Sequence, residues 1–222
     1  MKLPKRINPD NLIESIVEIR MNPITAQELW AGKLFQSIGM LGWSYLPAPK
    51  ANNNTPFYGL FINGDLRFTI QENSIVFNCS LKKYIGWERY RTEIKNVIEK
   101  IKMLSLIDYI DRIQIRYISE FKNVDLKDCV SNDIISCKDK FRCQIVKLEK
   151  SEGDTKVFIQ LTNSRRNGTS SSFFDVNVFE SFERTDSIEK VMVALENAHV
   201  KEKETFFELL DDSFLKTLNP EY

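Results

Sequence analysis

One histidine and three closely spaced cysteines are the side chains of this chain best suited to catalysis or metal binding. His199 is the only histidine among 222 residues. Hydrolytic triads and most metal sites use histidine, so a single copy removes their commonest designs. Its expected place on the apolar face of a helix favours a packed, hydrogen-bonded role. Cys129, Cys137 and Cys143 have no pair at zinc-knuckle spacing. We therefore expect no metal site.

Two arginines in a polar stretch are the first candidate binding residues. Arg165 and Arg166 lie within residues 163–171, which are rich in Ser, Asn and Gly. This composition predicts a loop between two strands. A loop with two guanidinium groups could hold a phosphate, whereas the alternative is an ordinary solvated hairpin loop.

A second arginine pair lies on the segment around which the chain is organised. Residues 111–121 alternate polar and apolar, which predicts a strand whose one face carries Arg112 and Arg116. Glu14 and Glu18 have the same four-residue spacing on an earlier predicted strand. If the two strands are neighbours, carboxylate–guanidinium pairs would form a ladder on one sheet face. The alternative is that Arg112 and Arg116 face an open surface and bind an anion.

Other motifs for catalysis or cofactor binding are missing from the sequence. With eight glycines there is neither a Gly-x-Gly-x-x-Gly run nor a Walker A run. Asp211 and Asp212 are adjacent carboxylates near a helix terminus, and residues 201–204 (Lys-Glu-Lys-Glu) predict a solvated helical surface with offsetting charges. We therefore expect neither a cofactor nor a catalytic residue, and a non-enzymatic protein is the favoured interpretation.

The expected elements follow from hydrophobic periodicity and turn residues. A long helix is predicted from about Trp87 to Ile107, with an apolar stripe through Ile94, Ile98 and Ile101. Thr25 and Asp186 are the expected caps of the first and last helices, and the last helix could continue to Leu218. Strands are predicted at 12–21, 57–62, 66–70, 74–80, 111–121, 140–149, 155–162 and 172–182. A turn-rich connection at residues 47–56 is the expected mobile loop, and a short helix is possible within 123–135.

These elements repeat in the same order in both halves of the chain. Residues 1–109 and 110–222 each contain strand, helix or irregular segment, three strands and long helix. This predicts an α+β fold: one continuous domain of antiparallel strands with two long helices on one face. A TATA-binding-protein-like saddle is the nearest architecture. A helix-grip sheet and two ferredoxin-like lobes are the alternatives.

Net charge and the lengths of the apolar runs indicate which binding partners and which cellular compartment to expect. The 31 basic and 31 acidic residues give zero net charge, whereas dedicated nucleic-acid binders are usually basic. No apolar run approaches the roughly 18 residues of a membrane span. A charged start leads into Asn8, Pro9 and Asp10, so we expect a cytoplasmic protein with reduced thiols and no membrane contact.

Three short motifs resemble a known family. They are residues 17–20 (Val-Glu-Ile-Arg), residues 112–118 (Arg-Ile-Gln-Ile-Arg-Tyr-Ile) and the ending from Ala198-His199 through Phe207-Glu208 to Leu215. This pattern is similar to a sporadically distributed family of uncharacterised bacterial and archaeal proteins. Gln114-Ile115 departs from the small-plus-Leu pair of that family. The resemblance implies a prokaryotic source and an association with mobile or defence genes, but no activity.

Three functions are compatible with these features. The first is a non-enzymatic binding or regulatory module acting through protein contacts, with a partner that the sequence does not name. The second is nucleic-acid binding across an open sheet face through Arg112, Arg116, Arg165 and Arg166. The third is a small-ligand pocket between sheet and long helix, lined by aromatic residues such as Trp87 and Tyr90.

Overall fold

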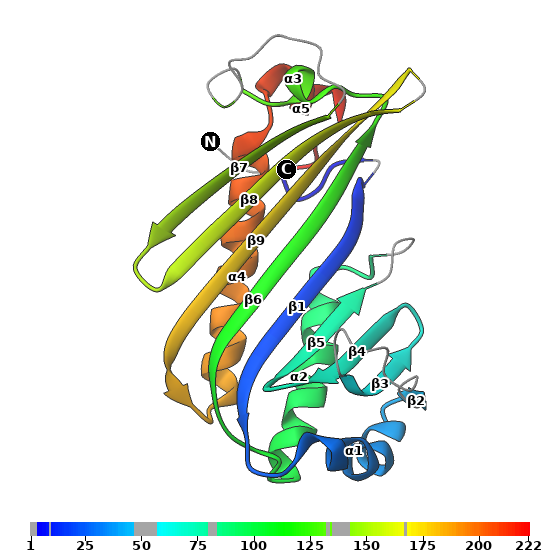
Figure 1. The fold of residues 1–222 in the computed structure, drawn as a ribbon, viewed down its shortest axis with the longest axis vertical. Helices are drawn as coiled ribbons and strands as arrows, with labels where there is room; N and C mark the ends of the chain where they lie inside the picture. The colour runs from blue at the N-terminus through cyan, green and yellow to red at the C-terminus, as the bar shows by residue number, and fades with distance from the viewer. Residues whose placement is uncertain are drawn as a thin grey trace.

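β1 (Leu12–Pro23) and β6 (Ile107–Lys122) are the central pair of one antiparallel sheet. The structure is a computed structural model that describes residues 4–8, 10–46, 57–79, 84–131, 134, 143–166 and 168–222. Within these ranges, the side chains of Phe57, Cys143 and Arg166 are not described. Within these ranges nine strands follow the order β2-β3-β4-β5-β1-β6-β9-β8-β7 (Figure 1). The predicted α+β class with an antiparallel sheet is confirmed. The predicted mobile connection at 47–56 lies outside the described residues.

The other strands are β2 (Ser44–Leu46), β3 (Phe57–Asn63), β4 (Leu66–Gln71), β5 (Ser74–Cys79), β7 (Cys143–Glu152), β8 (Thr155–Arg166) and β9 (Thr169–Thr185). The expected hairpin turn between β3 and β4 is present, and Gly64 in it has φ +60°. Positive φ suits glycine because it has no Cβ. The prediction of a nine-residue loop at 163–171 is wrong, because β8 and β9 stay paired as far as Arg166 and Thr169.

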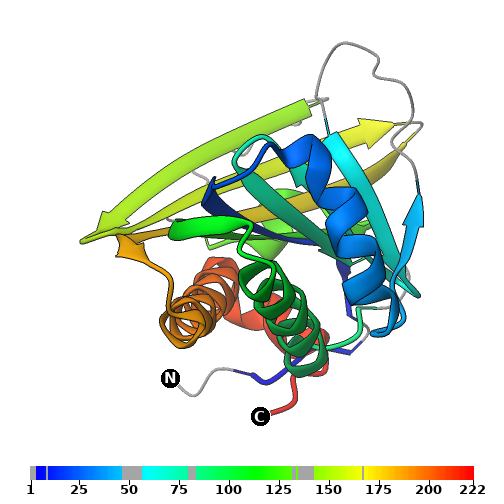
Figure 2. The same ribbon diagram turned by 90° about the horizontal axis from the view of Figure 1, so that it is seen from below.

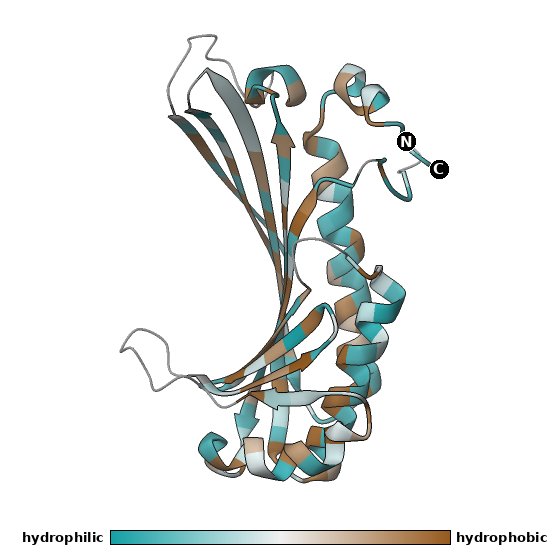
Figure 3. Ribbon diagram, turned by 90° about the vertical axis from the view of Figure 1, so that its right-hand side faces the viewer, coloured by the Kyte–Doolittle hydropathy of each residue, from teal (hydrophilic) through white to brown (hydrophobic). Residues whose placement is uncertain are grey.

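Two long helices cover one face of the sheet. α2 (Trp87–Met103) and α4 (Ile188–Leu209) lie under it in Figure 2, with α1 (Trp30–Gly39) beside α2. The shorter helices are η1 (Gln27–Leu29), α3 (Leu126–Cys129) and α5 (Asp212–Thr217). The sheet is curved, and its ends bend away from the helices (Figure 3). Among the described helices, none has both the length and the hydropathy of a membrane span.

Strand and helix periodicity place the core between sheet and helices. On β6 the side chains of Ile113, Ile115 and Phe121 are buried toward the helices. The predicted apolar stripe of α2 is buried as well; its members are Trp87, Tyr90, Ile94, Val97, Ile98 and Ile101. Burying apolar surface stabilises the folded state by roughly 25 cal/mol per Å². This layer is therefore the main source of stability.

Element ends differ from the prediction where long-range contacts decide them. α2 ends at Met103, before Ile107, and Ser105 then takes a positive φ of 51°. Residues from Ile107 onward instead extend β6, because they pair with the end of β1. Tertiary pairing thus overrides the helical pattern at these residues.

Helix caps differ from the predicted ones by small shifts. Ser187, the residue after Asp186, caps α4 by accepting a hydrogen bond from the Lys190 amide. Thr25 caps no helix, because its carbonyl and hydroxyl oxygens both accept from the Trp30 indole. The last helix breaks at Leu209, and Asp211 caps α5 as a separate helix.

Candidate functional site

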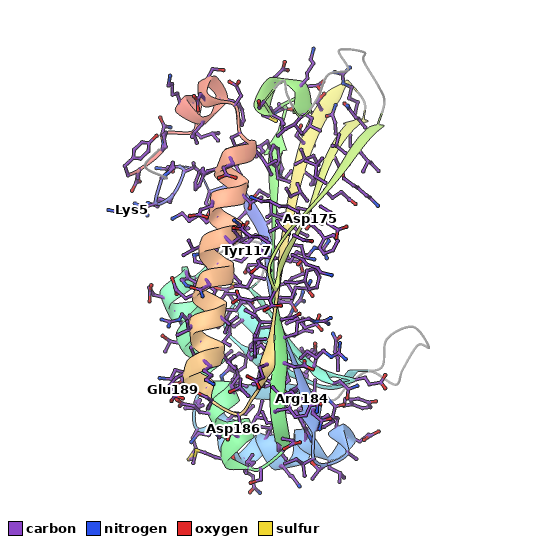
Figure 4. All side chains as sticks on the ribbon, turned by 90° about the vertical axis from the view of Figure 1, so that its left-hand side faces the viewer. Lys5, Tyr117, Asp175, Arg184, Asp186 and Glu189 are labelled. Atoms are coloured by element: carbon purple, nitrogen blue, oxygen red, sulfur yellow. The ribbon has the colours of Figure 1, made fainter. Side chains whose placement is uncertain are left out.

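A cavity of about 710 Å³ lies between the central strands and the helices α2 and α4. Its size is typical of small-molecule sites, which range over roughly 300–1,000 Å³. The wall includes residues from the N-terminal segment, from the start of α2, from β6 and from α4. They are Lys5, Arg6, Ile7, Asp10, Leu12, Tyr84, Gly86, Trp87, Glu88, Tyr117, Ser119, Glu196, His199, Val200, Glu202, Lys203, Phe206 and Phe207. Figure 4 shows Tyr117 between the sheet and α4, with Lys5 on the helix side.

Local geometry explains why these side chains meet. His199, Glu202 and Phe206 follow one another at steps of three and four along α4, so they share one helix face. Tyr117 and Ser119 are two apart on β6 and therefore share the helix-facing side. Helix and strand periodicity thus direct both sets into the same space.

His199 is held against the aromatic wall. Its ring stacks on that of Trp87 with centroids 4.1 Å apart and an interplanar angle of 16°. Trp87 Nε1 donates a hydrogen bond to Glu196 Oε2 at 2.8 Å, and Arg91 lies 3.5 Å from the same carboxylate. Burial lowers the pKa of His199 to about 4, so the imidazole is neutral near pH 7. Its Nδ1 is buried and has no hydrogen-bond partner among the described residues.

Two tyrosines form a second polar element of the wall. The hydroxyl oxygens of Tyr84 and Tyr117 are 2.7 Å apart and share one hydrogen bond. Burial raises the pKa of both phenols well above the ordinary value, so both stay protonated. One hydroxyl donates to the other, and the accepting hydroxyl keeps a hydrogen for a further acceptor.

Glu202 is the most unusual side chain of the cavity. It is 3% exposed, and burial raises its pKa to about 8. Among the described residues no group hydrogen-bonds to its carboxyl and no base lies within 4 Å. Glu202 lines the same cavity as Tyr84 and Tyr117. Buried polar groups are normally partnered, so this carboxyl departs from the usual pattern.

Arg112 and Arg116 lie on the opposite face of the sheet. Arg112 is 3.9 Å from Glu18 and 5.8 Å from the ring centre of Phe179. Arg116 binds Asp175 of β9 through two hydrogen bonds of 2.7 and 2.8 Å. The predicted ladder between β1 and β6 therefore forms at Arg112, whereas Arg116 takes a partner from the other neighbouring strand. Anion binding by either arginine stays a prediction.

Arg165 is a strand residue on the helix-facing side of β8, and the prediction of a loop cation is wrong for it. It is two residues from the buried Asn163, and both side chains donate to the Asp125 carboxylate, Asn163 at 3.1 Å. Asp125 precedes α3, so Arg165 ties β8 to that helix. Arg166 has its backbone in β8, and its side chain lies outside the described residues. Arg165 therefore lies on the other face of the sheet from Arg112 and Arg116, and binding by Arg166 stays a prediction.

Of the three closely spaced cysteines Cys129, Cys137 and Cys143, only Cys129 has a described side chain. This residue is buried, its Sγ donates to the Leu126 carbonyl oxygen at 3.4 Å, and burial raises its pKa to about 12. Cys137 and the Cys143 side chain lie outside the described residues. Within the described ranges, no three His, Cys, Asp or Glu side chains are placed to hold a metal ion.

The residues of the cavity were only partly foreseen from sequence. Trp87 lines it as predicted, whereas Tyr90 is in the core and donates to the Phe77 carbonyl oxygen. The prediction of a solvated surface at 201–204 is wrong for Glu202. The periodicity of α4 carries a signal for this burial, because the apolar stripe that includes Leu195 continues to His199 and then to Glu202 in steps of four and three residues.

Comparison with known proteins adds no assignment: the chain matches no protein-family model and no curated protein.

Proposed function

We propose that the chain binds a small organic molecule in the cavity between β6, α2 and α4. The observation that carries this proposal is a pair of buried polar groups on one cavity wall. Among the described residues, His199 Nδ1 has no hydrogen-bond partner, and the Glu202 carboxyl makes neither a hydrogen bond nor an ion pair. An unmet buried polar group costs about 1–3 kcal/mol. A ligand that supplies both partners would offset that cost, while the aromatic wall would bind its apolar part.

A blocked cavity tests this function. Val200 lines the cavity and is 44% exposed, so Val200→Trp should fill cavity space without displacing the core. Val193 is exposed on the same helix outside the cavity, and Val193→Trp is the matched control. A metabolite panel should contain a compound that raises the Tm of wild type and of Val193→Trp but not of Val200→Trp. Equal shifts in all three proteins would contradict binding in this cavity.

We also propose that residues 1–109 and 110–222 are two β-α-β-β-β-α repeats within one continuous domain. The strand order supports this, because β5, β4 and β3 follow outward from β1 as β9, β8 and β7 follow from β6. The outward bend of the sheet ends (Figure 3) is compatible with a TATA-binding-protein-like saddle. Because the cavity wall combines both repeats, neither half alone would contain the site.

Protein contacts and nucleic-acid binding stay predictions, as do the cytoplasmic location and the family resemblance. Nucleic-acid binding is the less favoured function, because Arg112, Arg116 and Arg165 each already contact a carboxylate. Real phosphate contacts would give an affinity that falls steeply between about 50 and 200 mM salt.

A further inference from the structure

The Glu202 carboxyl lacks a counter-ion although a base is next to it in sequence. The Lys203 ammonium donates to the Lys5 carbonyl oxygen at 2.9 Å, and it forms no ion pair with Glu202 among the described residues. The titratable groups that line the same part of the cavity are the Tyr84 and Tyr117 phenols, the neutral His199 ring and the Lys203 ammonium. None of them neutralises an ionised Glu202 at short range.

The charges of the cavity wall balance when Glu202 is left out. The basic side chains of the wall are Lys5, Arg6 and Lys203, and the carboxylates other than Glu202 are Asp10, Glu88 and Glu196. Arg6 and Glu196 have partners outside the wall, Glu221 and Arg91. Lys5 and Lys203 then face Asp10 and Glu88 in equal number. Glu202 is the fourth carboxyl, so one positive charge is missing when it ionises. An occupant with a single positive charge would restore the balance.

The rest of the wall suits a cation with an organic body. The rings of Tyr84, Trp87, Tyr117 and Phe206 all line the cavity. Aromatic faces attract ammonium groups, and this attraction grows when water is excluded. The Tyr84–Tyr117 hydroxyl pair and His199 Nδ1 offer further hydrogen bonds to polar substituents.

We infer that the ligand carries a protonated amine, which the Glu202 carboxylate binds within this aromatic wall. The inference rests on the proposed small-molecule function and names its chemical class. On binding, the ammonium keeps its proton, and the protonated Glu202 carboxyl releases its proton to solvent. The pair that forms is buried and charge-assisted, which makes it stronger than a neutral hydrogen bond.

Calorimetry with three matched probes tests the inference: 2-phenylethylamine, 2-phenylethanol and phenylacetate. Each probe is titrated at pH 7 in two buffers of different ionisation enthalpy, so that the difference in heat gives the number of protons released. Probe concentrations up to about 10 mM detect Kd values as weak as about 1 mM. The amine should bind at least about 10-fold tighter than the alcohol and release about one proton per molecule bound.

Two isosteric variants make the result specific. Glu202→Gln should weaken amine binding about 10-fold or more and abolish proton release, while binding of the alcohol is retained. Glu208→Gln is the control, because Glu208 is an exposed carboxylate on the same helix that does not line the cavity; it should leave amine binding and proton release unchanged. Amine binding without proton release, undiminished binding by Glu202→Gln, or preference for phenylacetate would overturn the amine inference and leave the cavity function standing. Binding of none of the probes to wild type would count against both.

Discussion

The imidazole of His199 lies flat against the indole of Trp87, with ring centroids 4.1 Å apart, so one contact joins α4 to the start of α2. Trp87 is anchored in turn by Glu196, which α4 also supplies. The cavity wall is therefore held by a closed set of contacts between two helices. A site on packed elements keeps its geometry better than one on loops.

Stability should depend on pH through Glu202. Its pKa is about 8 in the folded state against an ordinary 4.5, so between these values the folded state holds a proton that the unfolded chain has lost. Unfolding free energy then falls by about 1.4 kcal/mol per pH unit as pH rises. Below pH 6.5 His199, with its pKa lowered to about 4, has the opposite effect. The two effects should nearly cancel from about pH 4.5 to 6.5.

From pH 6.5 to 8 the Glu202 effect acts alone and should lower stability by roughly 2 kcal/mol. Urea unfolding of wild type and Glu202→Gln at pH 6.5 and pH 8 measures it. The variant should show no such loss. A wild type as stable at pH 8 as at pH 6.5 would mean that the carboxyl ionises normally.

Ile98→Ala should destabilise the protein by about 2–5 kcal/mol, because Ile98 is fully buried in the α2 stripe and its truncation leaves a core cavity. The exposed Val193→Ala on α4 is the control and should change stability by about 0.5 kcal/mol or less. Chemical unfolding midpoints compare the two. An unchanged midpoint for Ile98→Ala would show that this helix face does not pack on the sheet.

The ion pairs of the open face should differ in strength. Arg116 and Asp175 make a two-bond pair, whereas Arg112 and Glu18 are 3.9 Å apart. Double-mutant cycles should give about 1 kcal/mol of coupling for the first pair and less than about 0.5 kcal/mol for the second. Equal coupling in both cycles would show that the geometry of the first pair adds nothing.

Two glycine substitutions should have opposite signs. Gly64→Ala in the β3–β4 turn should cost about 1 kcal/mol, because φ is +60° there. Gly32 is in α1 without positive φ and has open space around its Cα, so Gly32→Ala should stabilise by about 0.5–1 kcal/mol. Thermal unfolding of both variants measures the difference. Stabilisation by Gly64→Ala would mean that the turn does not need this conformation.

The features that sequence predicted are those that local periodicity encodes. The alternation of β6, the apolar stripe of α2 and the Asn63-Gly64 hairpin all follow from steps of two, three or four residues. Features decided by distant partners were missed or misplaced. Arg165 is a strand residue because β8 stays paired with β9 there. Glu202 is buried because β6 and the N-terminal segment close over a helix face whose local sequence is highly charged.

The place of β6 in the sheet has a consequence for amide hydrogen exchange. β6 has a hydrogen-bonded strand on each side, whereas β2 and β7 are edges. The backbone behind Tyr117 and Ser119 should therefore exchange mainly through global unfolding, and the edge strands through local opening. The opposite wall, at Lys5–Ile7, has one amide that donates to a backbone oxygen among the described residues, that of Lys5 to Glu221. Occupancy of the cavity would therefore register as protection at that segment before it registered in the sheet.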